Sequence, residues 1–404
     1  MNVVIFSPSW PKRMNANGIV TYCDNMVASL RSQGHTVFVL SASRGGAVEK
    51  EEQCFFLDGY RPTLFQKLWA KVGEFFSAGF KQYYFGACAI LNGIREIEKI
   101  EKIDILEIEE SFGWHYFLQK KVSFPIAMRL HGPHYINGTM GEREIKTIDK
   151  QRFKREERAF RAAKYVNAPC RWILDESQDK YNIVWPVQTV FFNPLSVLPS
   201  KQCWSSSSYT PMQLLFVGRF DAHKGGDIVI RAFAQILLSE PNATLVFVGP
   251  NKGVELASGV KMYIADAISE YVPEYQKNQI RYVGLADAET IKQLRKNSHI
   301  TLMASRNEIL GYTVVESLAS AAPIIAPYVG GVREVFEGGI SGMFFKGSNV
   351  DDLANKTLSL LQDKSKTEKI ALAGRQRCKD SFSPELIASQ ALSFYSAVIR
   401  HHDK

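Results

Sequence analysis

The sequence predicts an α/β protein of two domains, each built around a parallel sheet with helices on its faces. Short apolar runs of strand length alternate with longer stretches of helical spacing, which is the pattern of successive βα units. The chain has 404 residues, enough for two domains that each bury a core. A serine run at 205–208, between Pro199 and Pro211, marks a polar linker between them.

The individual elements follow from these signals. In the first half, apolar runs predict strands at Val3–Phe6, Thr36–Leu40, Asp104–Ile108, Ile126–Leu130 and Val187–Phe191. Helical spacing predicts helices at Ile19–Ser32, Glu142–Ala163 and Pro384–Arg400. We therefore expect a first domain over 1–200, a linker over 201–210, a second domain over 211–381 and a final helical segment over 382–404.

The segment from Ser305 to Glu334 carries the strongest functional signal. It places Glu308 in a loop and Glu316 on the second turn of a helix that opens near Gly311. The unpaired amides and positive dipole end of that helix suit a phosphate, and the two carboxylates suit hydroxyl groups. This pattern predicts a nucleotide-sugar pocket. The alternative is an ordinary strand-loop-helix unit with two solvated glutamates.

A second signal lies upstream, where a buried strand ends at Gly218 and is followed by Arg219 and Lys224. Ligands of open α/β sheets bind beyond the carboxyl ends of strands, which is where these two cations fall. The chain has no Asp-x-Asp pair of the kind that holds a divalent cation in many sugar transferases. Cationic side chains and amides can neutralise a diphosphate instead, which predicts a site without a metal.

Together these stretches resemble the retaining glycosyltransferases of family 4, or glycosyl transferases group 1. Their GT-B fold has two Rossmann-like domains facing a central cleft. The similar segments occur in family order: Gly218-Arg219 with Lys224, Leu245–Gly249, Tyr282–Gly284, Glu308 with Glu316, Gly330-Gly331 with Glu334, and Gly342. The resemblance implies that the first domain binds the acceptor, that the second binds the nucleotide sugar, and that the last helix crosses back to the first.

The departures from the family pattern are local. Ile309-Leu310-Gly311 stands where the family usually has Gly-Phe-Gly, and Ala322 stands where a glycine commonly precedes Pro323. Ile309 carries a Cβ where the family's backbone approaches the sugar closely, so the departure concerns the donor sugar more than the reaction.

The resemblance also implies roles for single residues. Catalytic roles fall on Arg219, Lys224, His131 and Glu308, and donor-binding roles on Gly18, Gly218, Gly311, Tyr312, Thr313 and Glu316. Arg219, Lys224 and the helix N-terminus would stabilise the departing diphosphate, while Glu316 would hold the ribose and Glu308 the sugar hydroxyls. Taken alone, Gly18 and His131 are weak signals, because βα turns often hold one glycine and strand-end histidines are often structural.

The implied reaction is transfer of a sugar, with retention, from a nucleotide-diphosphate sugar to a glycan or lipid-linked acceptor in cell-envelope polysaccharide biosynthesis. The nucleotide sugar is a co-substrate, and no cofactor is expected. Another GT-B enzyme, such as a sugar-nucleotide epimerase or a phosphorylase, is the alternative. The sequence does not identify the nucleotide, the sugar, the acceptor or the oligomeric state.

Charge and hydropathy suggest a partner for the first domain. The net charge is +8, and residues 1–210 hold 27 Lys and Arg against 21 Asp and Glu, an excess of +6. The stretch from Leu64 to Tyr84 forms one apolar helical stripe flanked by cations, the pattern of a helix at an anionic membrane surface. A second basic stretch spans 143–164. Packing of the stripe in the core and solvation of the basic face are equally good interpretations.

Other classes are disfavoured. No Gly-x-Gly-x-x-Gly follows a predicted strand and no Gly-Lys-Ser/Thr loop occurs, which argues against a nucleotide-dependent oxidoreductase. No nucleic-acid-binding module accompanies the basic charge. Six scattered cysteines, no apolar run of membrane-spanning length, and a start directly on the strand at Val3–Phe6 predict a cytoplasmic protein, peripheral at the inner face of the cell membrane.

Overall fold

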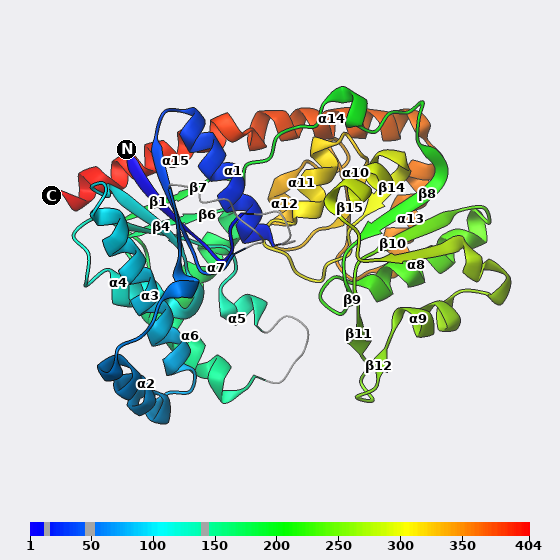
Figure 1. The fold of residues 1–404 in the computed structure, drawn as a ribbon. Helices are drawn as coiled ribbons and strands as arrows, with labels where there is room; N and C mark the ends of the chain where they lie inside the picture. Colours follow the sequence, from blue (N-terminus) through cyan, green and yellow to red (C-terminus); the bar gives the residue numbers. More distant parts are fainter. Residues whose placement is uncertain (12–16, 45–52, 139–144) are drawn as a thin grey trace. The chain divides into compact units, whose positions relative to one another are not determined.

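The computed structural model describes residues 1–11, 17–44, 53–138 and 145–404, which form two compact units (Figure 1). The first unit contains Met1–Pro194 and Pro384–Lys404, and the second contains Leu195–Ser383. The divisions therefore fall after Pro194 and after Ser383, and the serine run at 205–208 lies inside the second unit.

The first unit is built on a parallel seven-stranded sheet. In spatial order its strands are β3 (Cys54–Phe56), β2 (Thr36–Ser41), β1 (Asn2–Ser7), β4 (Ile105–Glu109), β5 (Ile126–Arg129), β6 (Tyr165–Ala168) and β7 (Val187–Val190). Its helices are α1 (Gly18–Ser32), α2 (Leu64–Phe76), α3 (Phe80–Glu98), α4 (Trp114–Leu118), α5 (His134–Asn137), α6 (Thr147–Ala162), α7 (Arg171–Tyr181) and α15 (Pro384–His402).

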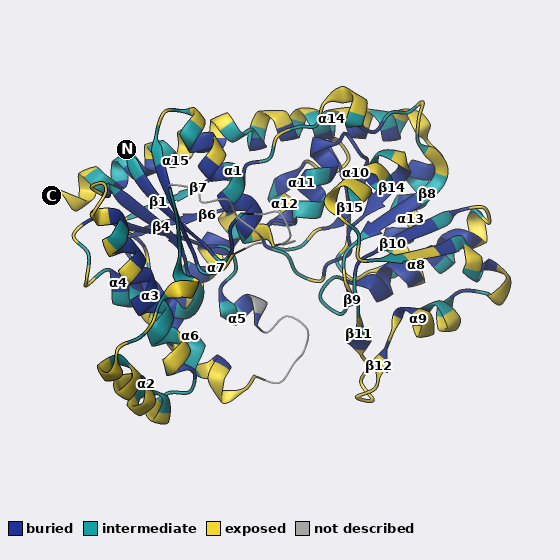
Figure 2. Cartoon of the chain, in the orientation of Figure 1, coloured by how far each residue is buried: buried dark blue, intermediate teal, exposed yellow. Residues whose placement is uncertain are grey.

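Alternate residues of each strand enter cores on opposite faces of this sheet, as the pleat requires. On β1, Val3 and Ile5 pack with α1 and α15, whereas Val4 and Phe6 pack with α3 and α4. Figure 2 shows the central strands as buried and most of helix α2, by contrast, as exposed.

The five strands predicted for this half are confirmed as β1, β2, β4, β5 and β7, whereas β3 and β6 were not predicted. The single helix expected from Leu64 to Tyr84 is wrong, because α2 ends at Phe76 and α3 begins at Phe80. Gly79 adopts φ 75°, a left-handed conformation that a helix cannot continue through. Residues 142–144 of the helix expected at 142–163 lie outside the described residues, and within the remainder α6 covers Thr147–Ala162.

A buried polar network ties α15 to the centre of this sheet. The carboxylate of Glu107 on β4 accepts hydrogen bonds from the hydroxyls of Tyr22 (2.6 Å) and Tyr395 (2.9 Å). It also accepts one from the amide of Asn167 (3.0 Å), whose oxygen accepts from the fully buried Arg129 (2.6 Å). The final helix therefore completes the first unit both through apolar packing and through a specific polar contact.

The second unit has a parallel six-stranded sheet and a small three-stranded sheet. The strands of the larger sheet are, in order, β13 (Ile280–Gly284), β10 (Thr244–Val248), β8 (Thr210–Val217), β14 (Ser298–Leu302), β15 (Ile324–Pro327) and β16 (Met343–Phe345). The smaller sheet holds β12 (Lys261–Met262), β11 (Asn251–Glu255) and β9 (Phe220–Asp221). The helices are α8 (Gly226–Ser239), α9 (Ile264–Tyr271), α10 (Ala288–Asn297), α11 (Tyr312–Ala319), α12 (Val332–Val335), α13 (Val350–Leu361) and α14 (Lys364–Phe382).

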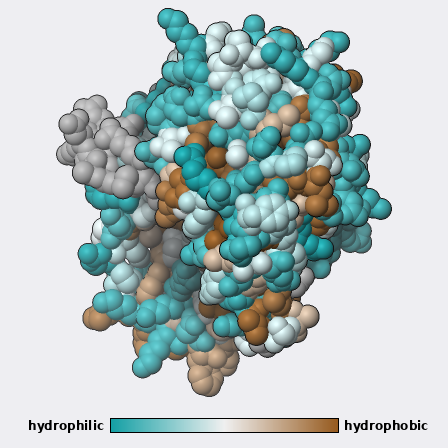
Figure 3. Space-filling model, turned by 90° about the vertical axis from the view of Figure 1, so that its right-hand side faces the viewer, coloured by the Kyte–Doolittle hydropathy of each residue, from teal (hydrophilic) through white to brown (hydrophobic). Residues whose placement is uncertain are grey.

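Both units are thus Rossmann-like, with parallel strands joined through helices, as the sequence predicts. In the second unit the main core lies between the sheet and helices α8 and α13. The face of the molecule in Figure 3 is mainly hydrophilic, and its apolar patches are interrupted by hydrophilic residues.

Candidate functional site

The candidate site of the second unit lies where its strand order reverses. The chain runs from β8 to β10 on one side of β8 and later returns to β14 on the other side. At such a point the loops after the two neighbouring strands diverge and leave room for a ligand. The loop after β8 carries Gly218, Arg219 and Lys224, and the loop after β14 carries Glu308 and Gly311.

Asp221 organises the two cations of the first loop. Its carboxylate accepts from the side chain of Arg219 (Nε, 2.5 Å) and from the backbone amide of Lys224 (2.8 Å). His223 joins this loop to the next, since its Nε2 lies 2.9 Å from the carbonyl oxygen of Asn307. A carbonyl can only accept, so Nε2 carries the proton and Nδ1 faces Arg219 as an acceptor.

The two loops meet in an ion pair between Lys224 and Glu308, with 2.5 Å between Nζ and Oε2. The Ser305 hydroxyl donates to the same Oε2 at 3.3 Å. Burial alone would raise the pKa of Glu308, but the charge and hydrogen bond of Lys224, with smaller effects from His223 and Ser305, leave this pKa lowered. The side chain of Glu308 is therefore a fixed carboxylate. It is not the solvated glutamate of an ordinary strand-loop-helix unit.

Glycines allow the backbone to close around Glu308. Gly330 has φ 48°, and a Cβ there would lie 2.1 Å from the carbonyl oxygen of Glu308. Gly311 has φ 76° and is the N-cap of α11, beside the side chain of Glu308. Ile309 and Leu310, which replace the family's Gly-Phe, are both buried.

Helix α11 begins with Tyr312 and Thr313, both half-buried, and carries Glu316 on its second turn. The backbone amides of Tyr312 and Thr313 lie at the N-terminal end of this helix, where its dipole is positive. The Glu316 carboxylate is paired through Oε2 with Arg295 of α10 at 2.8 Å. Arg295 is buried whereas the side chain of Glu316 is 41% exposed, so the arginine holds a carboxylate that solvent and ligands can reach.

Gly18 and His131 belong to the first unit. Gly18 is exposed and opens α1, while His131 follows β5 and packs its ring edge-on against Tyr22 at 4.9 Å between centroids. Burial, and secondarily the charge of Arg129, lowers the pKa of His131 well below its ordinary value, so its imidazole is neutral. Residues 15 and 16, which precede Gly18 in the similar segment, lie outside the described residues.

Two buried carboxyl groups, Glu109 and Glu110, lie at the end of β4, and the second contacts the backbone at His131. Glu110 accepts from the backbone amides of His131 (2.9 Å) and Gly132 (2.6 Å). Burial, with the charge of Glu109, raises the pKa of Glu110 to about 8, and burial raises the pKa of Glu109 to about 7. Glu110 therefore shapes the loop that presents His131.

Sequence reasoning assigned no role to Asp221, His223, Arg295 or Glu110. Asp221 and His223 lie inside the quoted segment between Arg219 and Lys224, so their position was a usable signal. No sequence signal pointed to Arg295, because its partner lies on a different helix.

Among residues 1–11, 17–44, 53–138 and 145–404, no group of three His, Cys, Asp or Glu side chains is placed to hold a metal ion. Over the same residues, none of the helices has the length and apolar character needed to cross a membrane.

Comparisons with known proteins identify the family and the fold. The family model described as Glycosyltransferase Family 4 matches residues 16–191, and that described as Glycosyl transferases group 1 matches residues 205–377. A glycosyltransferase of Methanocaldococcus jannaschii is 26% identical over 185 residues, which are 45% of this chain and 44% of that protein. The chain thus matches less than half the length of this relative.

Two solved structures share the fold over nearly the whole chain. Sucrose-phosphate synthase from Thermosynechococcus elongatus has a TM-score of 0.71 at 16% identity, covering 99% of both chains. A structure of Anabaena Alr3699/HepE in complex with UDP-glucose has a TM-score of 0.69 at 16% identity, covering 98% of this chain and 100% of that one.

The two Rossmann-like units and these likenesses define a protein of the GT-B class. Because the two family models together span both units, the chain belongs to the group 1, family 4 glycosyltransferases.

Proposed function

We propose that this protein is a retaining glycosyltransferase that uses a nucleoside-diphosphate sugar and needs no metal. The observation that carries the proposal is the Lys224–Glu308 ion pair beside the N-terminus of α11, with Arg219 on the same loop. A diphosphate requires cations and amide donors, and a sugar requires hydroxyl acceptors. The relative solved with UDP-glucose supports this class of donor.

The carboxylates of Glu308 and Glu316 each have one oxygen that can bind the donor. In the described part of the chain, the side-chain partners of Glu308 all contact Oε2, and Arg295 likewise contacts Oε2 of Glu316. We assign Oε1 of Glu308 to the sugar hydroxyls and Oε1 of Glu316 to the ribose.

The departing diphosphate gains negative charge as the bond to the anomeric carbon breaks. Lys224, Arg219 and the first amides of α11, at Tyr312 and Thr313, stabilise that charge from fixed positions. A phosphate is already a good leaving group and needs no acid, so neither glutamate acts as a glycosidase carboxylate. In the first unit, we assign to neutral His131 hydrogen bonds to the donor sugar, and to the start of α1 at Gly18 a contact with the donor phosphate or the acceptor.

The acceptor is a glycan or lipid-linked molecule of cell-envelope polysaccharide biosynthesis, met at the inner face of the membrane. The basic first unit supports this assignment, because such acceptors are commonly anionic.

Product analysis with a labelled donor, in the presence and in the absence of acceptor, tests the reaction class. Altered sugar without acceptor would indicate an epimerase, and a requirement for free phosphate would indicate a phosphorylase.

Calorimetry should separate the two glutamates. Glu316→Ala should weaken both the bare nucleoside diphosphate and the complete donor by roughly 10- to 100-fold, the loss of a charged hydrogen bond. Glu308→Ala should weaken mainly the sugar-bearing donor. If Glu308→Ala weakens both ligands equally, its assignment to the sugar is wrong.

Arg295 should act through Glu316 as a positioning residue. Arg295→Met should weaken nucleoside-diphosphate binding in the same direction as Glu316→Ala, because the carboxylate loses its orienting partner. The double variant should bind no more weakly than Glu316→Ala alone. Fully additive losses in this double-mutant cycle would mean that the two residues act independently.

A further inference from the structure

Helix α2 presents an apolar face to solvent. Its large apolar side chains have exposed fractions of 45% to 86%, and they are Leu64, Phe65, Leu68, Trp69, Val72, Phe75 and Phe76. Figure 2 shows most of the helix as exposed. Single exposed apolar residues are ordinary, but a contiguous face of this kind marks an interaction surface.

The fold holds this face outward. On the opposite side of α2, Ala70 is buried, and Gly73 leaves room for the ring of Phe80 on α3. A Cβ on Gly73 would lie 2.1 Å from that ring, so the two helices pack too closely for a side chain there. Glu74 then caps α3 by accepting from the amides of Gly79 and Lys81, both at 2.7 Å.

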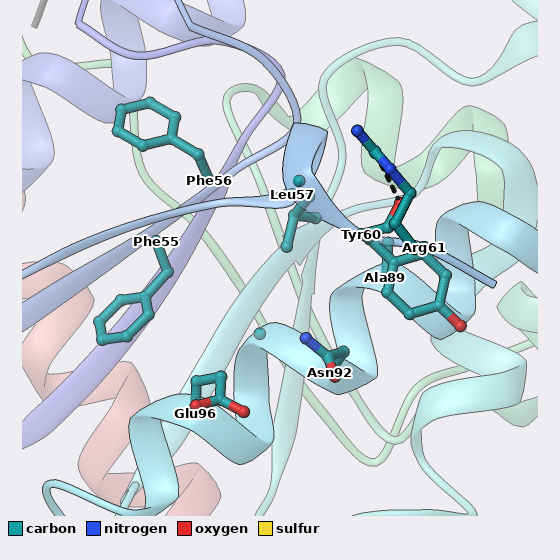
Figure 4. A pocket seen from close by; sticks show the side chains of 10 residues that line it. Phe55, Phe56, Leu57, Tyr60, Arg61, Ala89, Asn92 and Glu96 are labelled. Atoms are coloured by element: carbon teal, nitrogen blue, oxygen red, sulfur yellow. Dashed lines mark hydrogen bonds between the residues drawn. The ribbon is translucent and has the colours of Figure 1, made fainter. Parts of the chain in front are cut away.

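Both ends of α2 are also fixed. At its start, Thr63 and Gln66 form a capping box, and Tyr60 donates to Gln66 at 2.7 Å. Figure 4 shows Tyr60 and Arg61 near Ala89 of α3, where they line a hollow of about 260 Å³.

Past the end of α2, Arg155 of α6 donates to the Ser77 hydroxyl (3.1 Å) and to the Ala78 carbonyl (3.2 Å). Rotating the apolar face inward would break these contacts.

Cations border the apolar face on one side. Lys67 and Lys71 of α2 and Lys81 of α3 line an open hollow of about 730 Å³ together with Phe75, Phe85 and Glu74. All three lysines are exposed, and within the described ranges none forms an ion pair. Three ammonium groups against one carboxylate give the hollow a net positive charge.

We propose that α2 and this hollow dock the protein on an anionic phospholipid membrane. The apolar face enters the boundary between headgroups and acyl chains, and the three lysines contact headgroup phosphates. Interfacial helices combine these two features, each basic residue near the surface adding favourable energy. A second copy of the chain fits less well, because an antiparallel isologous contact between the helices would bring the two lysine edges together.

The docking proposal rests on the proposed function in one respect: the docked surface is where the protein meets a lipid-linked acceptor. Vesicle binding and nucleotide binding are measured separately, so that either proposal can fail alone.

Co-sedimentation with vesicles of phosphatidylcholine, with and without phosphatidylglycerol, tests the docking. The wild type should bind only the anionic vesicles, and less as salt rises. Lys67→Glu with Lys71→Glu should weaken binding by roughly 25-fold or more, at about fivefold per lost charge. The control Lys364→Glu with Lys379→Glu changes the net charge equally on exposed sites of α14 and should bind as the wild type does.

The apolar contribution has its own variants. Leu64→Ser with Phe75→Ser should also release the protein, whereas Leu238→Ser, at an equally exposed position on α8, should not. Trp69 is 52% exposed, so its fluorescence should shift to shorter wavelength on anionic vesicles, and this shift should vanish in Trp69→Phe.

Indifference of the wild type to anionic vesicles at low salt would overturn the proposal. Equal binding by the lysine variant and its control would also overturn it. A concentration-dependent dimer that is lost in the apolar variant, without vesicle binding, would identify the face as a contact between copies. Thermal melting and nucleoside-diphosphate binding should stay at wild-type values in every α2 variant.

Discussion

Replacing Lys224 or Arg219 with alanine should lower turnover by roughly 10²–10³-fold, the usual loss for one preorganised group that stabilises transition-state charge. The expected loss is in kcat, because the charge on the leaving diphosphate grows as the reaction proceeds. Lys224 is the more informative position, since it also holds the Glu308 carboxylate. Steady-state kinetics with saturating donor measure the effect.

Lys379→Ala, on an exposed position of α14, is the matched control and should turn over as the wild type does. Melting temperatures must be compared, because Lys224→Ala leaves Glu308 without its partner. A chelator should have little effect on the wild type. Wild-type turnover in either variant, or loss of activity with EDTA, would contradict the metal-free model.

Glu107→Ala should lower the free energy of unfolding of the first unit by about 3–5 kcal/mol, the cost of breaking a buried, charged network. The substitution removes the acceptor for Tyr22, Tyr395 and Asn167 at once and leaves their polar groups buried. Hydrogen exchange under increasing urea, followed by mass spectrometry, measures the effect in peptides from β1 and β4. Peptides from β8 and β14 should exchange as in the wild type.

Two milder variants grade this result. Tyr395→Phe removes a single hydroxyl and should cost about 1 kcal/mol. Glu98→Ala, on the exposed end of α3, should change stability by less than about 0.5 kcal/mol. If Glu107→Ala is as stable as Glu98→Ala, the network does not hold α15 in place.

The fold class and the second-unit segments could be predicted from the sequence because their signals are local. A strand, the loop after it and the next helix are contiguous, so Lys224 and Glu308 could each be placed at a strand end. Their pairing was not predicted, because it depends on β14 lying beside β8, which the order of strands along the chain does not reveal. Arg295 could not be found in this way, because it reaches Glu316 from another helix.

Several elements of the first unit could not be predicted from the sequence. The three residues of β3 are too short to show a period, and the polar Asn167 interrupts the short apolar run of β6. Helical spacing identified the apolar stripe from Leu64, but periodicity does not say what covers a face. The break between α2 and α3 was marked by Gly79, whose conformation only the structure reveals.

The return of the chain to the first unit has a consequence for biosynthesis. Helix α15 covers one face of the first sheet, yet the ribosome makes it after the whole second unit. The second unit can fold as soon as it emerges, whereas the core that Val3 and Ile5 form with α1 stays incomplete until α15 is made. A nascent chain of this protein therefore carries an incomplete amino-terminal core for most of its synthesis.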